Sequence, residues 1–94
     1  MERMKRLKIE IEPELSACIE TKAKREYQAI LSALLKEGEQ SELRERLEIL
    51  RLFLETTDFK QLRGEYEKYL TAGKRIRFIL RRGEDEPKYD MQIT

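Results

Sequence analysis

The sequence predicts a two-layer α+β fold with a small, mainly antiparallel sheet and the element order β-α-α-(α)-β-β. Three observations lead to this prediction. Segments that alternate apolar and charged residues lie near both ends, amphipathic segments with helical spacing fill the middle, and Gly, Pro and capping residues separate them. The length of 94 residues corresponds to one domain, spanning residues 1–94.

The first strand and the first helix follow each other directly. Residues 6–12 alternate strictly, with apolar residues on one face and charged residues on the other, which is typical of a half-buried strand. Pro13 suits the first position of a helix. Apolar residues then recur at helical spacing from Leu15 to Leu34, and Gly38 provides a stop. The pattern predicts one long amphipathic helix.

The second predicted helix is apolar on two sides. Ser41 is a suitable cap, and the helix carries an apolar seam of leucines: Leu43, Leu47, Leu50 and Leu54. Ile49, Leu52 and Phe53 do not lie on that seam, and at ~100° per residue Leu52 points almost opposite to Leu43. One side can pack on the first helix, but the other side needs a second cover.

A third helix and a hairpin complete the chain. Asp58 can cap the helix, and Ala72-Gly73 ends it. Residues 74–82 and 88–94 both alternate, and residues 83–87 between them form a turn. This pattern predicts an antiparallel hairpin.

A homodimer is expected because a chain this short buries little surface alone. Small domains are usually stabilised by disulfides, metals or oligomerisation. Cys18 is the only cysteine and histidine is absent, which argues against a disulfide within the chain and against a metal site. Oligomerisation remains, and a narrow sheet with two edges would be completed in a homodimer. The predicted contact consists of Ile49, Leu52, Phe53, Met91 and Ile93.

The sequence offers no set of residues for catalysis. Without histidine, neither Cys18 nor any serine has an activating base, so the thiol is interpreted as a small buried hydrophobe. The four glycines are isolated, and no phosphate-binding loop is present. We therefore expect no enzymatic activity, no cofactor and no small-molecule ligand. The leading hypothesis is a homodimeric interaction or scaffold module.

One basic surface gives an alternative hypothesis. Its candidate residues for contact with a polyanion are Lys8, Arg75, Arg77, Arg81 and Arg82. Outward-facing arginines on a sheet can bind nucleic acid. The competing interpretation is cross-strand pairing, since Glu10, Glu12 and Asp90 occupy the same outward positions. The whole chain is nearly neutral, with 20 Lys+Arg against 19 Asp+Glu, which argues against a general polyanion binder.

Location and source are also suggested by the sequence. No run approaches the ~20 apolar residues of a membrane span, and no apolar signal-peptide core follows the basic N-terminus, so a cytoplasmic protein is expected. The abundance of Lys and Glu is typical of thermophiles. As a whole, the chain resembles a small protein of unknown function from a hyperthermophilic archaeon. That resemblance implies no site residues.

Overall fold

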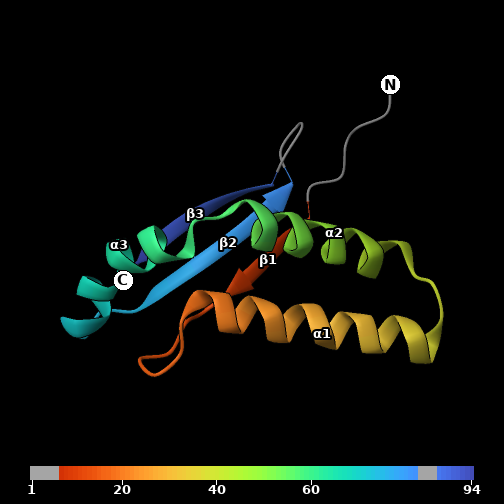
Figure 1. Ribbon diagram of the computed structural model, residues 1–94, viewed down its shortest axis with the longest axis horizontal. Helices are drawn as coiled ribbons and strands as arrows, with labels where there is room; N and C mark the ends of the chain where they lie inside the picture. Colours follow the sequence, from red (N-terminus) through yellow and green to blue (C-terminus); the bar gives the residue numbers. More distant parts are fainter. Residues whose placement is uncertain (1–6, 83–86) are drawn as a thin grey trace.

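The computed structural model describes residues 7–82 and 87–94 and confirms the α+β class. Over these residues it contains three helices and one three-stranded antiparallel sheet (Figure 1). The elements are β1 (Lys8–Ile11), α1 (Ile19–Glu37), α2 (Ser41–Thr56), α3 (Phe59–Thr71), β2 (Ile76–Arg82) and β3 (Pro87–Ile93). Residues 83–86 of the predicted turn lie outside the described residues.

β2 is the central strand, and the order in the sheet is β1-β2-β3. Ile9 of β1 faces Leu80 of β2, and Tyr89 of β3 faces the same Leu80 from the other side. The predicted hairpin is therefore confirmed, and β1 lies antiparallel to the strand that follows all three helices. The sheet joins the beginning of the chain to its end.

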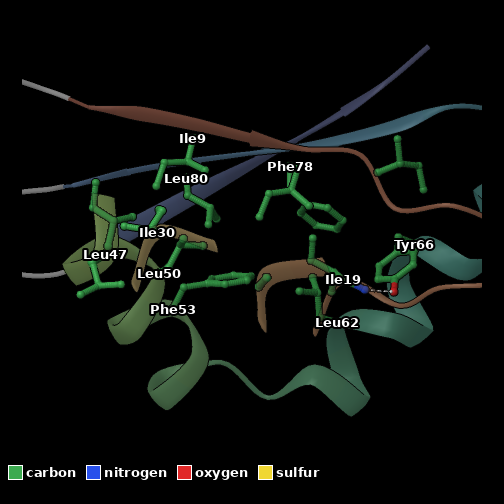
Figure 2. Close-up of a cluster of buried hydrophobic side chains, with 14 of the residues drawn as sticks. Ile9, Ile19, Ile30, Leu47, Leu50, Phe53, Leu62, Tyr66, Phe78 and Leu80 are labelled. Atoms are coloured by element: carbon green, nitrogen blue, oxygen red, sulfur yellow. Dashed lines mark hydrogen bonds between the residues drawn. The ribbon is translucent and has the colours of Figure 1, made fainter. Parts of the chain in front are cut away.

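Among the described residues, the helices cover one face of the sheet and no helix lies on the other face, which is called the open face below (Figure 1). α1 packs along α2 and on β1, α2 packs on β2 and β3, and α3 packs on β2. Strand residues on the covered face meet apolar residues of all three helices in one core (Figure 2). Its largest fully buried side chains are Ile19, Ile49, Leu50, Tyr66, Phe78 and Leu80.

The start of α1 differs from the prediction. Pro13 was expected at the first helical position, but the helix begins at Ile19, and Leu15 is 78% exposed instead of lying on the apolar face. A backbone hydrogen bond from Ala17 N–H to Glu14 C=O makes a single turn before the helix. Ile19 is fully buried, and its N–H donates to the Tyr66 hydroxyl at 2.9 Å. This buried partner satisfies one of the free N–H groups of the first turn, so tertiary packing fixes the helix start.

The boundaries of the other helices follow the sequence more closely. α2 begins at Ser41, one residue after its cap Gln40, so Ser41 is the first helical residue and not the cap. The Asp58 side chain accepts a hydrogen bond from Gln61 N–H at 3.2 Å, which confirms it as the cap of α3. That helix ends at Thr71, with Ala72 as its C-cap residue, and Gly73 follows with a φ of 81°, a left-handed conformation that favours glycine.

Candidate interaction surfaces

Two of the five predicted dimer-contact residues belong to the core of the chain itself. Ile49 is 1% exposed and Phe53 is 2% exposed, and the Phe53 ring contacts Phe59 and Tyr89 edge-on. The prediction is corrected for these two, because the sheet and α3 already cover this side of α2. Helical spacing alone could not show how far the sheet would reach across α2.

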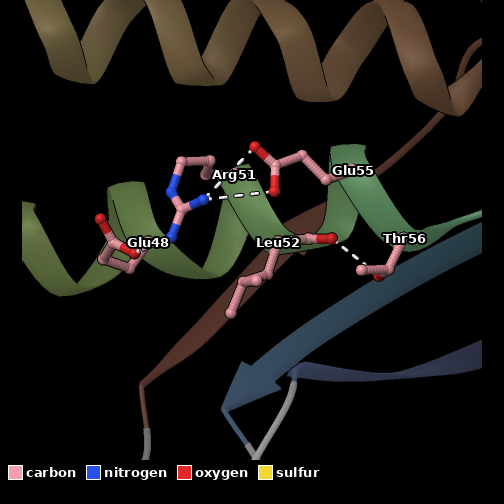
Figure 3. Close-up of polar contacts among 5 residues, drawn as sticks. All are labelled: Glu48, Arg51, Leu52, Glu55 and Thr56. Atoms are coloured by element: carbon pink, nitrogen blue, oxygen red, sulfur yellow. Dashed lines mark hydrogen bonds and ion pairs between the residues drawn. The ribbon is translucent and has the colours of Figure 1, made fainter.

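Leu52 lies elsewhere on α2. Its side chain is half-buried but stands outside the packed core cluster. Figure 3 shows it on the side of α2 that points away from α1. Next to it, Arg51 binds Glu48 at 2.6 Å and Glu55 at 3.2 Å, so the polar strip of α2 is held by its own ion pairs (Figure 3). The Arg51 hydrogen bond also lowers the pKa of the Glu48 carboxyl.

β3 presents a stripe of incompletely covered side chains on the helix-covered face of the sheet. Tyr89 is 38% exposed and Ile93 is 39% exposed, while Met91 between them is half-buried against the core. The Tyr89 ring packs against Phe53 at 5.9 Å and Phe78 at 6.0 Å between centroids. The residues Tyr89, Met91 and Ile93 are called the β3 stripe below. It contains both predicted contact residues of the final strand.

The β3 stripe continues onto the helices. A depression beside Tyr89 is lined by residues from the end of α2 and the beginning of α3, including Thr56, Gln61 and Glu65. Burial raises the pKa of the Tyr89 hydroxyl, and the nearby Glu65 carboxylate acts in the same direction. The Tyr89 hydroxyl therefore lies beside the apolar side chains of the β3 stripe, where β3 adjoins the end of α2 and the beginning of α3.

The open face of the sheet carries the predicted basic residues together with carboxylates. Arg77 donates to Glu12 at 3.0 Å and lies 3.7 Å from Glu10, and Arg81 lies 2.6 Å from Asp90. Lys8 lies 3.9 Å from Glu10 in the same strand. The structure thus places the arginines of this face in the cross-strand pairs that were the competing interpretation.

The remaining basic candidates are arranged differently. Arg75 is exposed just before β2, and among the described residues no carboxylate lies within 4.0 Å of it. Its backbone exchanges hydrogen bonds with Thr94, at 3.2 and 3.0 Å, which extends the β2–β3 ladder. Arg82 is exposed at the other end of β2. The five predicted cations therefore do not form one uniform basic patch.

Ile79 lies at the centre of the open face. Its neighbours across the sheet are Glu10 and Asp90, yet only 7% of its surface is exposed. It is absent from the helix-covered core, as its position in the strand requires. The alkyl stems of long charged side chains commonly cover apolar surface in this way.

The groups with reactive potential have structural partners. Cys18 occupies the N-cap position of α1 without a capping side-chain hydrogen bond, and its Sγ lies 3.3 Å from the Thr21 hydroxyl, a hydrogen bond that lowers the pKa of the thiol. The sequence interpretation of Cys18 as buried is corrected, since it is only half-buried. Within residues 7–82 and 87–94, no cluster of acidic or cysteine side chains could hold a metal ion.

Comparison with known proteins places the chain in a family. A protein-family model matches residues 1–86. The chain belongs to this family. A relative from Archaeoglobus fulgidus, described as an uncharacterized protein, is 45% identical over 49 residues. That match covers 49% of this chain and 58% of the relative, so the chain spans somewhat more than half of the relative's length.

These matches bear out the resemblance to a small archaeal protein of unknown function. No solved structure matches the chain. Among the described residues, no helix has the length and apolar character needed to cross a membrane.

Proposed function

We propose that this protein is a non-enzymatic interaction module that works as a homodimer, with its contact on the β3 side of the molecule. The observation that carries this proposal is the β3 stripe, three neighbouring side chains of which two are more than a third exposed. Leu52 on the flank of α2 adds an apolar side chain outside the core. Contiguous exposed apolar surface of this kind usually marks a contact with another protein.

The small size of the chain favours a second copy as the partner. The core is built from three helices and one face of a three-stranded sheet, and small domains are often stabilised by association. Self-association also needs no other gene product, and two-fold dimers are the commonest oligomers of soluble proteins.

The test of this proposal is the mass of the protein in solution. Light scattering after size exclusion, over a wide range of loading concentrations, should give twice the chain mass of 11.3 kDa. The variant Ile93→Lys should shift the mass towards the monomer, because it puts a charge into the apolar contact. The matched control Gln92→Lys changes the neighbouring side chain on the open face and should remain dimeric. A wild-type mass of one chain at every concentration would refute the homodimer.

Nucleic-acid binding is the second candidate, favoured by the exposed Arg75 and by an open face on which no helix of the described residues lies. The carboxylates beside Arg77 and Arg81 weigh against it, since they would repel phosphates. Fluorescence anisotropy with labelled single- and double-stranded DNA and RNA at low and physiological salt tests this function. Micromolar binding that weakens steeply with salt, and is lost in Arg75→Glu, would favour nucleic acid over the interaction module.

A further inference from the structure

The two edges of the sheet differ in what they offer to a further strand. Arg75 of the β2 side and Thr94 of the β3 side exchange two backbone hydrogen bonds. Along an antiparallel ladder, hydrogen-bonded pairs of this kind alternate with pairs that form no hydrogen bonds to each other. Lys88, Asp90 and Gln92 therefore direct their backbone groups to β2. The N–H and C=O groups of Tyr89, Met91 and Ile93 point the opposite way, to the open edge of β3.

The same alternation describes the edge at β1. Phe78 and Leu80 of β2 do not form backbone hydrogen bonds with β3, so their backbone N–H and C=O groups point to β1. Their partners in β1 are Ile11 and Ile9, whose backbone groups therefore point to β2. The groups directed outward at this edge belong to Lys8 and Glu10, whose side chains are charged and exposed. β1 is also only four residues long, against seven in β3. Short, charged edges are protected against pairing.

At the β3 edge, the backbone groups and the apolar side chains belong to the same residues. Tyr89, Met91 and Ile93 make up the β3 stripe, so a strand added here would meet both unpaired backbone groups and exposed apolar surface. A strand that pairs with this edge should therefore carry an apolar side chain at every second position. β3 itself has that pattern.

The charges on the open face select between two registers of β3 against a second β3. With Met91 on the two-fold axis, Tyr89 faces Ile93 of the second copy, and both exchange hydrogen bonds. Asp90 then faces Gln92 of the second copy. A shift that puts Asp90 on the axis makes the two Asp90 carboxylates face each other, and like charges directly opposite are unfavourable.

We infer that a second copy of this chain pairs antiparallel with the open edge of β3, with Met91 of both copies on the two-fold axis. The two sheets become one continuous six-stranded sheet, three strands from each copy. This inference rests on the homodimer proposed above, and it adds the place of the contact and its register. The occupant of the β3 edge is the β3 of the second copy.

The axis also brings the helices of both copies into the contact. It stands perpendicular to the joined sheet, so both helix layers lie on the same side of it. Leu52 points away from α1 (Figure 3). In this arrangement we place it towards the helix layer of the second copy. Stable interfaces bury roughly 1,200–2,000 Å² in total, which is more than a single strand pair supplies. The flank of α2 is the surface that extends this contact.

Disulfide cross-linking tests the register with Asp90 left in place. In a Cys18→Ser background, the variant Lys88→Cys/Thr94→Cys puts one thiol opposite the other in the Met91-centred register. These residues form a non-hydrogen-bonded pair, in which Cα atoms lie ~4.5 Å apart and a disulfide fits. The matched control Lys88→Cys/Gln92→Cys has no facing thiols in the Met91-centred register, but it has them when Asp90 or Gln92 lies on the axis. The single variant Lys88→Cys reports random collisions.

The expected result is a nearly complete shift of Lys88→Cys/Thr94→Cys to a covalent dimer under mild oxidation, with both controls remaining monomeric in denaturing gels. Covalent dimer in Lys88→Cys/Gln92→Cys alone would overturn the register. A dimer by light scattering with cross-linking in neither double variant would overturn edge pairing and leave the homodimer standing. A monomer by light scattering would overturn both.

Amide hydrogen exchange of the unmodified protein gives a second, independent readout. In an unpaired β3, the N–H groups of Lys88, Asp90 and Gln92 are protected while those of Tyr89, Met91 and Ile93 exchange rapidly. Pairing with a second copy protects all six. Strict alternation of fast and slow amides along β3, in protein that scatters light as a dimer, would overturn the inference.

Discussion

The Tyr66 hydroxyl accepts a hydrogen bond from the backbone N–H of Ile19 at 2.9 Å, and both residues are buried. This contact joins α3 to the first turn of α1 across 47 positions of the chain. The Tyr66 ring also packs on Phe78 of β2, at 5.3 Å between centroids (Figure 2). One side chain therefore connects the two helices to the central strand.

Removal of the Tyr66 hydroxyl should destabilise the fold. Tyr66→Phe keeps the ring contact with Phe78 but leaves the buried N–H of Ile19 without a partner. A buried unsatisfied donor costs about 1–3 kcal/mol, and urea denaturation should show a loss of that size. Tyr69→Phe, at a half-buried position of the same helix, is the control and should change stability less. Equal losses in both variants would contradict the role of the hydroxyl.

Stability should also fall at alkaline pH because of Tyr66. Burial raises the pKa of its hydroxyl above the usual value near 10, although the Ile19 hydrogen bond opposes this. The protonated Tyr66 hydroxyl therefore makes its full contribution to the free energy of unfolding below the pKa that it has in the unfolded state. This contribution is lost as pH rises towards the higher pKa of the folded state. The free energy of unfolding, measured at a series of alkaline pH values, should decline less steeply in Tyr66→Phe than in the wild type. Identical slopes would show that Tyr66 does not contribute.

The cap of α3 should be measurable by substitution. Asp58→Ala removes the acceptor of the Gln61 N–H and should cost about 1 kcal/mol. Asp58→Asn or Asp58→Ser keeps a capping oxygen and should retain most of the stability. Thermal denaturation of the three variants distinguishes loss of the cap from a general effect of altered charge.

Leu52 and Ile49 should separate association from folding, although they lie three residues apart on α2. Leu52→Glu alters a side chain outside the core and should yield a folded monomer. Ile49→Glu puts a charge where only 1% of the side chain is exposed and should unfold the chain. Circular dichroism and light scattering on both variants check the two outcomes. A Leu52→Glu variant that remains dimeric with unchanged stability would remove Leu52 from the contact.

Arg77 should contribute little to stability in spite of its two carboxylate partners. The Arg77–Glu12 pair is about half exposed on both sides, and exposed pairs contribute roughly 0–1 kcal/mol. Arg77→Gln should therefore shift the denaturation midpoint only slightly, and the shift should shrink in high salt. Arg75→Gln is the control, because among the described residues no carboxylate lies within 4.0 Å of the Arg75 side chain. A large salt-independent loss in Arg77→Gln would show that the open face is covered in the native protein.

The sequence was sufficient for the features that depend on local chemistry. Asp58 was identified as a cap by its residue type, and the hairpin by its alternation and turn residues, and both are present in the structure. The alternation of residues 74–82 also requires Ile79 to lie on the face opposite to the core, and the structure places it there.

The features that sequence alone could not place depend on contacts between distant segments. The apolar spacing around Leu15 continues that of α1, but the buried Tyr66 hydroxyl offers a partner at Ile19, and the helix starts there. Likewise, the apolar residues of α2 spread over more of the helix surface than contact with one helix requires. Nothing in the local sequence indicated that the sheet and Phe59 would cover Phe53. On the open face, the alternation of the strands predicted which side chains point away from the core. It could not predict that Arg77 and Arg81 come close enough to carboxylates to form ion pairs.

The position of β1 beside β2 has a consequence for how the protein is made. β1 leaves the ribosome before its partner strand β2, because three helices lie between the two strands in the chain. Until then, β1 and the apolar sides of α1 and α2 have no sheet to pack on, and such nascent chains are prone to aggregate. Closure of the sheet is also a contact between distant residues, which slows folding. The rate of synthesis and the supply of chaperones should therefore affect the yield of this small protein more than its length suggests.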